Sequence, residues 1–199
     1  TCAERRIGDN AHMISRCLCL MMFLSTLHAE APFFESLKEH VNQHPRGDVA
    51  FSFDRSRYAD GADLSGLPIG VFDSGIGGLT VLEAILTADV FHNDTLKPGA
   101  DGKRDFENER FIYLGDQANM PYGNYSAVGK VDYLRELILK DAVFLLGNRY
   151  WPSAGAKEPK RDKPPVKAIV IACNTATAYG LEDLRKATKA WGIPMIVVG

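Results

Sequence analysis

Three short segments of the sequence contain residue types that acid/base chemistry uses. Cys173 lies between an apolar run and a helical pattern, in Ile-Ala-Cys-Asn-Thr-Ala. A thiol at a helix N-terminus meets free N–H groups and the helix dipole, which favour the thiolate. Asn174 and Thr175 add hydrogen-bond donors that suit a carboxylate. The pattern favours a reactive cysteine beside a carboxylate site over a small core residue.

The second segment, Asp73-Ser74-Gly75-Ile76-Gly77-Gly78, also follows an apolar run. Glycines let the backbone turn sharply and bring N–H groups at a helix N-terminus close to an anion. The segment does not match the dinucleotide-binding fingerprint, because Thr80 occupies the position of its third glycine. Asp116, the acidic residue at the next strand end, also lies beyond the expected spacing of about 20 residues. Two interpretations stay open: an anion-binding loop, or a strand-to-helix turn with Asp73 as its cap.

The third segment runs from Leu114 to Gly123 and ends in Pro-Tyr-Gly. Tyr122 and Gly123 in such a loop can present a phenol and backbone N–H groups to a ligand. Proline and glycine are also turn formers, so a purely structural turn is the alternative.

Composition narrows the classes of partner and cofactor. The chain has 23 basic and 25 acidic residues and a net charge of -2, without the basic excess of a protein that binds nucleic acid or an anionic membrane. Cys173 has no nearby histidine pair, so the usual four-ligand zinc set is missing and no metal is expected.

Short apolar runs alternate with helical patterns from Leu67 onward, which predicts an α/β fold with βα units on a parallel sheet. All three chemical segments follow predicted strands, at the sheet edge where open α/β folds bind ligands. The expected strands are 67–72, 110–114, 166–172 and 195–198, and the expected helices lie near 35–41 and 79–86, over 126–146 and near 179–187.

The N-terminal region predicts a leader. Residues 13–31 have a short basic region, an apolar region and an Ala-x-Ala-like end, as in a signal peptide, although a buried amphipathic helix is the alternative. A real leader implies an exported or periplasmic protein, and otherwise the protein is cytoplasmic. The expected divisions are upstream residues and leader at 1–31, an N-terminal extension at 32–66 and a catalytic domain at 67–199.

The three segments together resemble the cofactor-independent aspartate/glutamate racemase family, and within it the enzymes that act on glutamate. The resemblance rests on Gly-Val-Phe-Asp-Ser-Gly-Ile-Gly-Gly from Gly70, on Tyr-Leu-Gly-Asp with Pro-Tyr-Gly from Tyr113, and on Ala-Cys-Asn-Thr-Ala-Thr-Ala from Ala172. It implies a racemase of two pseudo-symmetric α/β domains that needs no cofactor and supplies D-glutamate for peptidoglycan. It leaves a homodimer open.

The resemblance also implies roles for residues. Cys173 would be one of two catalytic cysteines, with Asp73 as a catalytic neighbour that assists or orients it. The substrate-binding residues would be Ser74, Tyr122, Gly123, Asn174 and Thr175. Exchange without pyridoxal phosphate needs a base on one face of the α-carbon and an acid on the other, which a thiolate and a thiol can provide.

The sequence departs from the family in three respects. The second cysteine, in a Gly-Cys-Thr-His motif, is not found before Gly199, the polar segments 92–109 and 149–165 look long, and a leader is unusual. We therefore expect a fragment that does not racemise alone, with the second domain largely missing. The alternatives are an aspartate or broad-specificity racemase, or a non-catalytic module that binds amino acids or nucleotides.

Overall fold

The computed structural model describes residues 32–199, so the predicted leader lies outside the described residues. Four strands pair in parallel in the order β2-β1-β3-β4, which confirms the predicted α/β class with a parallel sheet. Each strand begins one or two residues later than predicted. The strands are β1 Ile69–Asp73, β2 Phe111–Gly115, β3 Ala168–Ile171 and β4 Ile196–Val198.

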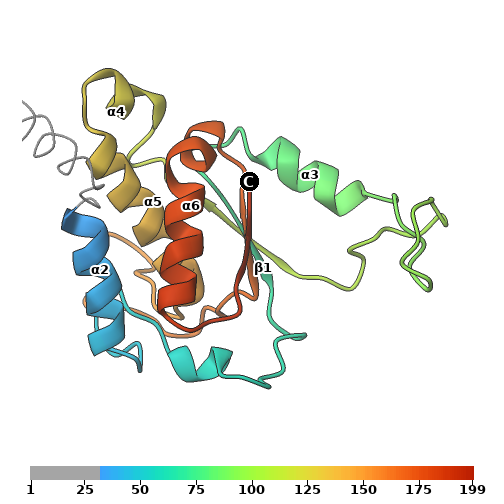
Figure 1. Cartoon of the computed structure of the whole chain (residues 1–199), viewed down its shortest axis with the longest axis horizontal. Helices are drawn as coiled ribbons and strands as arrows, with labels where there is room; N and C mark the ends of the chain where they lie inside the picture. The colour runs from blue at the N-terminus through green and yellow to red at the C-terminus, as the bar shows by residue number, and fades with distance from the viewer. Residues whose placement is uncertain (1–31) are drawn as a thin grey trace, which may run out of the picture. The chain divides into compact units, whose positions relative to one another are not determined.

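The helices lie on both sides of this sheet (Figure 1). Right-handed crossovers place α3 on one face and the neighbours α5 and α6 on the other. Arg135 of α5 and Asp183 of α6 form a bidentate ion pair across their contact, at 2.5 and 2.9 Å. The three helices are α3 Leu79–Thr87, α5 Val131–Leu146 and α6 Asn174–Ala190.

The prediction of a single helix over 126–146 is wrong, because the structure has two helices in this region. The short helix α4 spans Gly123–Ala127, and α5 begins only at Val131. Gly129 has φ 71°, and the N–H of Lys130 donates to the carbonyl of Tyr125 at 2.8 Å. This is the Schellman arrangement, in which a residue of left-handed conformation ends a helix.

Residues 33–66 pack into the same compact unit as the sheet, which spans Phe33–Gly199. The Nε1–H of Trp191 donates to the carbonyl of Lys38 in α2 (Pro32–Gln43) at 3.1 Å. Tyr58, in the 3-10 helix η1 (Arg55–Tyr58), donates its hydroxyl to the carbonyl of Val166 at 2.9 Å. The segment predicted as an extension therefore contributes buried side chains to the core.

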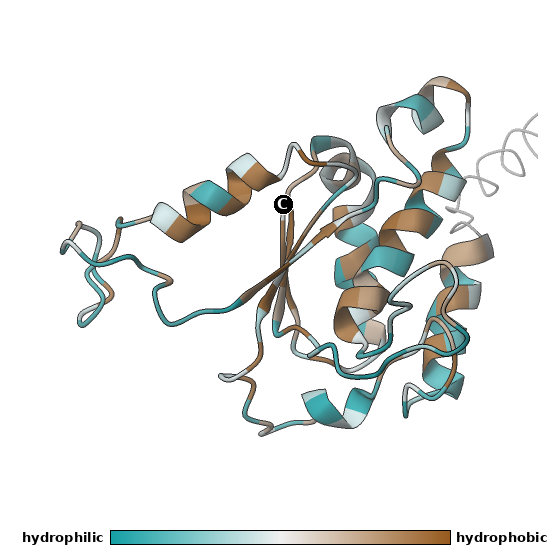
Figure 2. Ribbon diagram, turned by 180° about the vertical axis from the view of Figure 1, so that it is seen from behind, coloured by the Kyte–Doolittle hydropathy of each residue, from teal (hydrophilic) through white to brown (hydrophobic). Residues whose placement is uncertain are grey.

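The strands are hydrophobic along their length, as Figure 2 shows. The α3 side of the sheet is only thinly covered: α3 has no buried residue, and Ile196 and Val198 of the edge strand are 64% and 45% exposed. No helix within residues 32–199 is long and apolar enough to cross a membrane.

We expect Gly180→Ala to destabilise the protein. Gly180 lies in α6 against the fully buried Ile138 of α5, and a Cβ at this position would overlap the Ile138 side chain. The overlap should cost about 1–3 kcal/mol, outweighing the better helix propensity of alanine. Urea unfolding measures the change. Gly155→Ala is the control, since nothing lies within 4 Å of a Cβ there; equal stability of the two variants would contradict the expectation.

Candidate active site at the carboxyl edge of the sheet

The parallel pairing brings the three chemical segments to one edge. Asp73, the last residue of β1, pairs with Gly115, the last residue of β2, and Phe72 pairs with Ile171 at the end of β3. The residues that follow these strand ends are the predicted site residues. Gly115 allows the first two segments to approach closely because it has no side chain. A Cβ at this position would lie 2.6 Å from the carbonyl oxygen of Gly75.

Cys173 occupies the N-cap position of α6 with an extended backbone, φ -114° and ψ 116°. Its side chain is buried, with 8% of its surface exposed, and its Sγ lies 3.5 Å from the Oγ of Ser74. The cysteine of the first segment and the serine of the second are therefore brought into contact. The free N–H groups of the first helical turn lie beside them.

Asp73 closes the glycine turn between β1 and α3. Its Oδ1 accepts from the N–H of Ser74 and its Oδ2 from the N–H of Gly78, each at 2.8 Å. Gly78 must be a glycine, because a Cβ would lie 2.7 Å from the Cβ of Ala172. The turn thus packs against the residue that precedes Cys173. Asp73 therefore closes the strand-to-helix turn and holds Ser74 beside the thiol, but it does not cap α3, whose N-cap is Gly78 without a side-chain hydrogen bond.

Tyr113 is a site residue to which sequence reasoning assigned no role. Its hydroxyl donates to the carbonyl of Gly75 at 3.0 Å. Burial, and then the nearby charges of Asp73 and Cys173, raise the pKa of Tyr113 above its usual value. The only signal in the sequence was its place in Tyr-Leu-Gly-Asp, two residues before a strand end.

The phenol of Tyr122 does not face the thiol. The residue is 1% exposed, and its hydroxyl oxygen lies 2.7 Å from Oδ2 of Asp116 and 2.7 Å from Oδ2 of Asp141 in α5. The idea that this phenol is presented to a ligand is therefore not supported by its position. Gly123 does approach the segment that contains Cys173, since a Cβ there would lie 3.9 Å from the Oγ1 of Thr175.

The two short contacts of the Tyr122 hydroxyl oxygen, to Asp116 and to Asp141, need two protons in order to be hydrogen bonds. One phenol proton cannot be donated to two carboxylates at once. Burial, with the charge of Asp116 adding to it, raises the pKa of Asp141 to about 7. Protonated Asp141 can donate to the Tyr122 oxygen while Tyr122 donates to Asp116, which also accepts from the Nδ2 of Asn119.

Asn174 and Thr175 begin α6, directly after the thiol. Asn174 is exposed and Thr175 is half-buried. Asn174 also lines an open hollow on the β4 side of the helix start, together with Val81, Thr177 and Val198. Ser74 and Tyr113 approach Cys173 from the β1 and β2 side. Within residues 32–199, no group of three or more His, Cys, Asp or Glu side chains is placed to hold a metal.

Curated proteins of known name are similar to much of this chain. Glutamate racemase of Clostridium novyi is 37% identical over 134 residues, which cover 67% of this chain and 37% of that protein. Glutamate racemase of Enterococcus faecalis is 37% identical over 131 residues, which cover 66% of this chain and 33% of that protein. The chain is related to the glutamate racemases. It spans about a third of the length of these relatives.

No protein-family model matches the chain. Among solved structures, glutamate racemase of Thermus thermophilus in complex with beta-chloro-D-alanine is 29% identical and covers 68% of this chain and 37% of that one, with a TM-score of 0.37. The relationship of this chain to glutamate racemases therefore rests on its sequence similarity to the curated proteins.

We expect Asp141→Asn to remove a pH dependence of stability. The folded chain keeps the Asp141 proton up to about pH 7, whereas the unfolded chain releases it near pH 4. The folded state binds more protons between these values, so stability should fall as pH rises, by up to about 1.4 kcal/mol per pH unit. Asparagine keeps a donor for Tyr122 but does not titrate.

Urea unfolding of the parent chain and of Asp141→Asn at a series of pH values between 5 and 7.5 measures this difference. The variant should be the more stable of the two at the high end of the series. Asp60→Asn, at an exposed position, is the control and should follow the parent chain. Parallel profiles for the parent chain and Asp141→Asn would refute the protonated state of Asp141.

Proposed function

We propose that this chain carries one acid/base face of a glutamate racemase site, with Cys173 as the group that exchanges the α-proton. The observation that supports this most is the position of its Sγ: buried at the start of α6 and 3.5 Å from Ser74 Oγ, in a chain related to glutamate racemases. The thiolate would accept the α-proton of one enantiomer, and the thiol would return a proton to the same face.

The surrounding residues would orient the thiol and bind the substrate. Asp73 would act through Ser74, because its carboxylate accepts from the Ser74 N–H and closes the turn that carries the serine. Asn174 and Thr175, with the free N–H groups at the start of α6, would bind a carboxylate of glutamate and stabilise negative charge that develops at the α-carbon.

Tyr122 and Gly123 would contribute through the backbone, since the Tyr122 phenol is occupied by Asp116 and Asp141. The aspartate cluster would then hold the loop in place beside Thr175. In this role Tyr122 is a positioning residue, and only the backbone of the Pro-Tyr-Gly loop would meet the substrate.

The proposal extends to the whole protein. A two-base reaction needs a second acid/base group on the opposite face of the α-carbon, which the family places in a second, pseudo-symmetric domain. The product D-glutamate would supply peptidoglycan synthesis and so support the cell wall and cell shape. A homodimer, export through a leader at 13–31 and a catalytic domain over 67–199 belong to the same proposal.

The test is exchange of the glutamate α-hydrogen in deuterium oxide, followed by NMR separately for L- and D-glutamate. We expect the 199-residue chain to exchange one enantiomer without converting it, since one base serves one face. Cys173→Ala should lower the exchange rate by at least about 100-fold, the usual contribution of a positioned acid/base group.

Cys19→Ala is the matched control, because it removes a thiol outside the described residues and should leave the rate unchanged. Circular dichroism confirms that both variants fold. Exchange that persists in Cys173→Ala would refute the role of the thiol. Conversion of L- to D-glutamate by this chain alone would refute the one-face description.

A further inference from the structure

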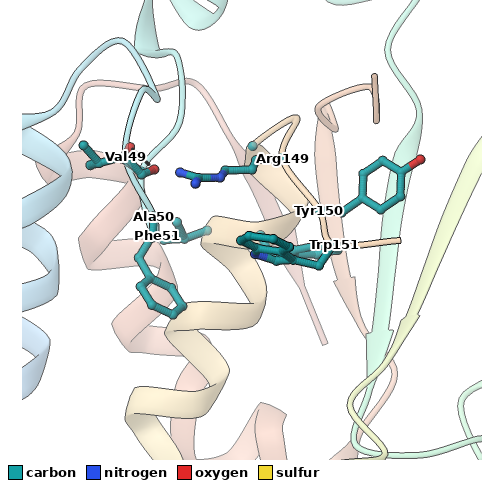
Figure 3. A pocket seen from close by; sticks show the side chains of 10 residues that line it. Val49, Ala50, Phe51, Arg149, Tyr150 and Trp151 are labelled. Carbon is teal, nitrogen blue, oxygen red and sulfur yellow. Dashed lines mark hydrogen bonds between the residues drawn. The ribbon is translucent and has the colours of Figure 1, made fainter. Parts of the chain in front are cut away.

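A second hollow, of about 180 Å³, lies at the opposite edge of the sheet from Cys173 (Figure 3). Its walls are the turn 49–52, the last turns of α5 and the segment 149–151. The C-terminal end of α5 and the loop that leads into β3 belong to the amino-terminal edge of a parallel sheet. The hollow is therefore separate from the candidate active site.

Arg149 reaches across this hollow without a partner. Figure 3 shows its guanidinium extending towards Val49 and Ala50 on the facing wall. Its Nε is the one buried side-chain polar atom within residues 32–199 that has no hydrogen-bond partner. A buried donor without an acceptor costs free energy, so an acceptor that reaches the guanidinium would remove this cost.

The rest of the lining is mostly apolar, with Ser52 and Tyr150 as its polar side chains, and contains no acidic side chain. Phe51 and Trp151 are 51% and 56% exposed, and Val143 and Phe144 of α5 close the hollow from below the surface. Phe51 has φ 53°, a left-handed conformation that is strained for a bulky residue and that clusters at binding sites. A cavity of about 150 Å³ already accommodates a benzene ring in another protein, so this volume suits a ring-sized apolar group.

The walls are fixed in position by hydrogen bonds. The backbones of Tyr150 and Lys160 exchange two hydrogen bonds at 3.0 and 2.8 Å, which anchors the segment after Arg149. Arg161 donates to the carbonyls of Gly47 and Asp48 at 3.3 and 3.2 Å and so ties this loop to the facing turn. A preformed pocket binds a ligand with less loss of conformational entropy.

We propose that this hollow binds a small carboxylate with an apolar, ring-sized body. The planar guanidinium of Arg149 matches a carboxylate in a forked, two-bond geometry, and the carboxylate supplies the acceptor that Nε lacks. The apolar body would lie against Phe51 and Trp151. Glutamate fits poorly, because its ammonium group and second carboxylate would be buried without partners.

Benzoate is the probe, titrated into the full 199-residue chain with the ¹⁵N–¹H signal of Arg149 Nε as the direct readout. Arg149→Gln identifies that signal by its loss. A ligand of this size should bind with a Kd on the order of 1 mM. We expect benzoate to shift the Arg149 signal, and benzamide, which has the same ring and no charge, to bind at least about 10-fold more weakly.

Binding by calorimetry compares the variants. Arg149→Gln should weaken benzoate at least about 10-fold, whereas Arg104→Gln, an exposed arginine in a distant polar segment, should leave it unchanged. Arg149→Lys, which keeps the charge but loses the fork, should fall between the two. A thermal unfolding curve for each variant shows that it is folded.

Three results would overturn the proposal. One is the absence of any benzoate effect on the Arg149 signal up to about 20 mM, well above the affinity expected for a ligand of this size. Another is equal binding by the parent chain and Arg149→Gln. The third is an equal effect of chloride or inorganic phosphate at the same concentration, which would show that an apolar body is not recognised.

Discussion

The carboxylate of Asp73 accepts hydrogen bonds from the N–H groups of Ser74 and Gly78, and the candidate site depends on the turn that these bonds close. The turn carries Ser74 to Cys173 and packs Gly78 against Ala172, so β1 and β3 are fixed relative to each other where the chemistry would occur. Neither strand end could shift without breaking a buried hydrogen bond or opening this contact.

The loop after β2 is held by a different device, the buried Asp116–Tyr122–Asp141 cluster. This cluster ties the Pro-Tyr-Gly loop to α5 through one phenol between two carboxylates. Burial, with the charge of Asp116 adding to it, raises the pKa of Asp141 to about 7, so that Asp141 can supply the second proton that this geometry requires. The loop is therefore positioned by hydrogen bonds between side chains, while the glycine turn is positioned by backbone N–H groups that donate to one carboxylate.

The two edges of the sheet differ in their chemistry. The carboxyl edge gathers a thiol, hydroxyls and helix N–H groups around Cys173, as a site for a polar substrate needs. The amino edge has the Arg149 guanidinium, whose Nε has no partner, among mostly apolar walls. These walls include residues 49–52 of the predicted extension and residues 149–151 of the long polar segment 149–165. Segments to which the sequence assigned no chemistry thus line this second hollow.

The sequence by itself determined the α/β class, the four strands to within two residues and the grouping of Asp73, Ser74, Cys173, Asn174 and Thr175 at one edge. These features follow from local patterns, because apolar runs form buried strands and parallel strands end on the same side. The sequence also contains Gly129, but it did not predict that a helix ends there. The left-handed conformation of Gly129 accompanies hydrogen bonds that a periodic pattern does not reveal.

Only the tertiary structure decided which way each side chain points. Tyr122 lies in the interior because Asp116 and Asp141 approach it from two elements, and Tyr113 joins the site because its hydroxyl reaches Gly75 in another loop. The Nε of Arg149 has no hydrogen-bond partner where the segment 149–151 meets the turn 49–52 and the end of α5. These outcomes depend on contacts between residues far apart in the chain, for which local propensity and spacing contain no signal.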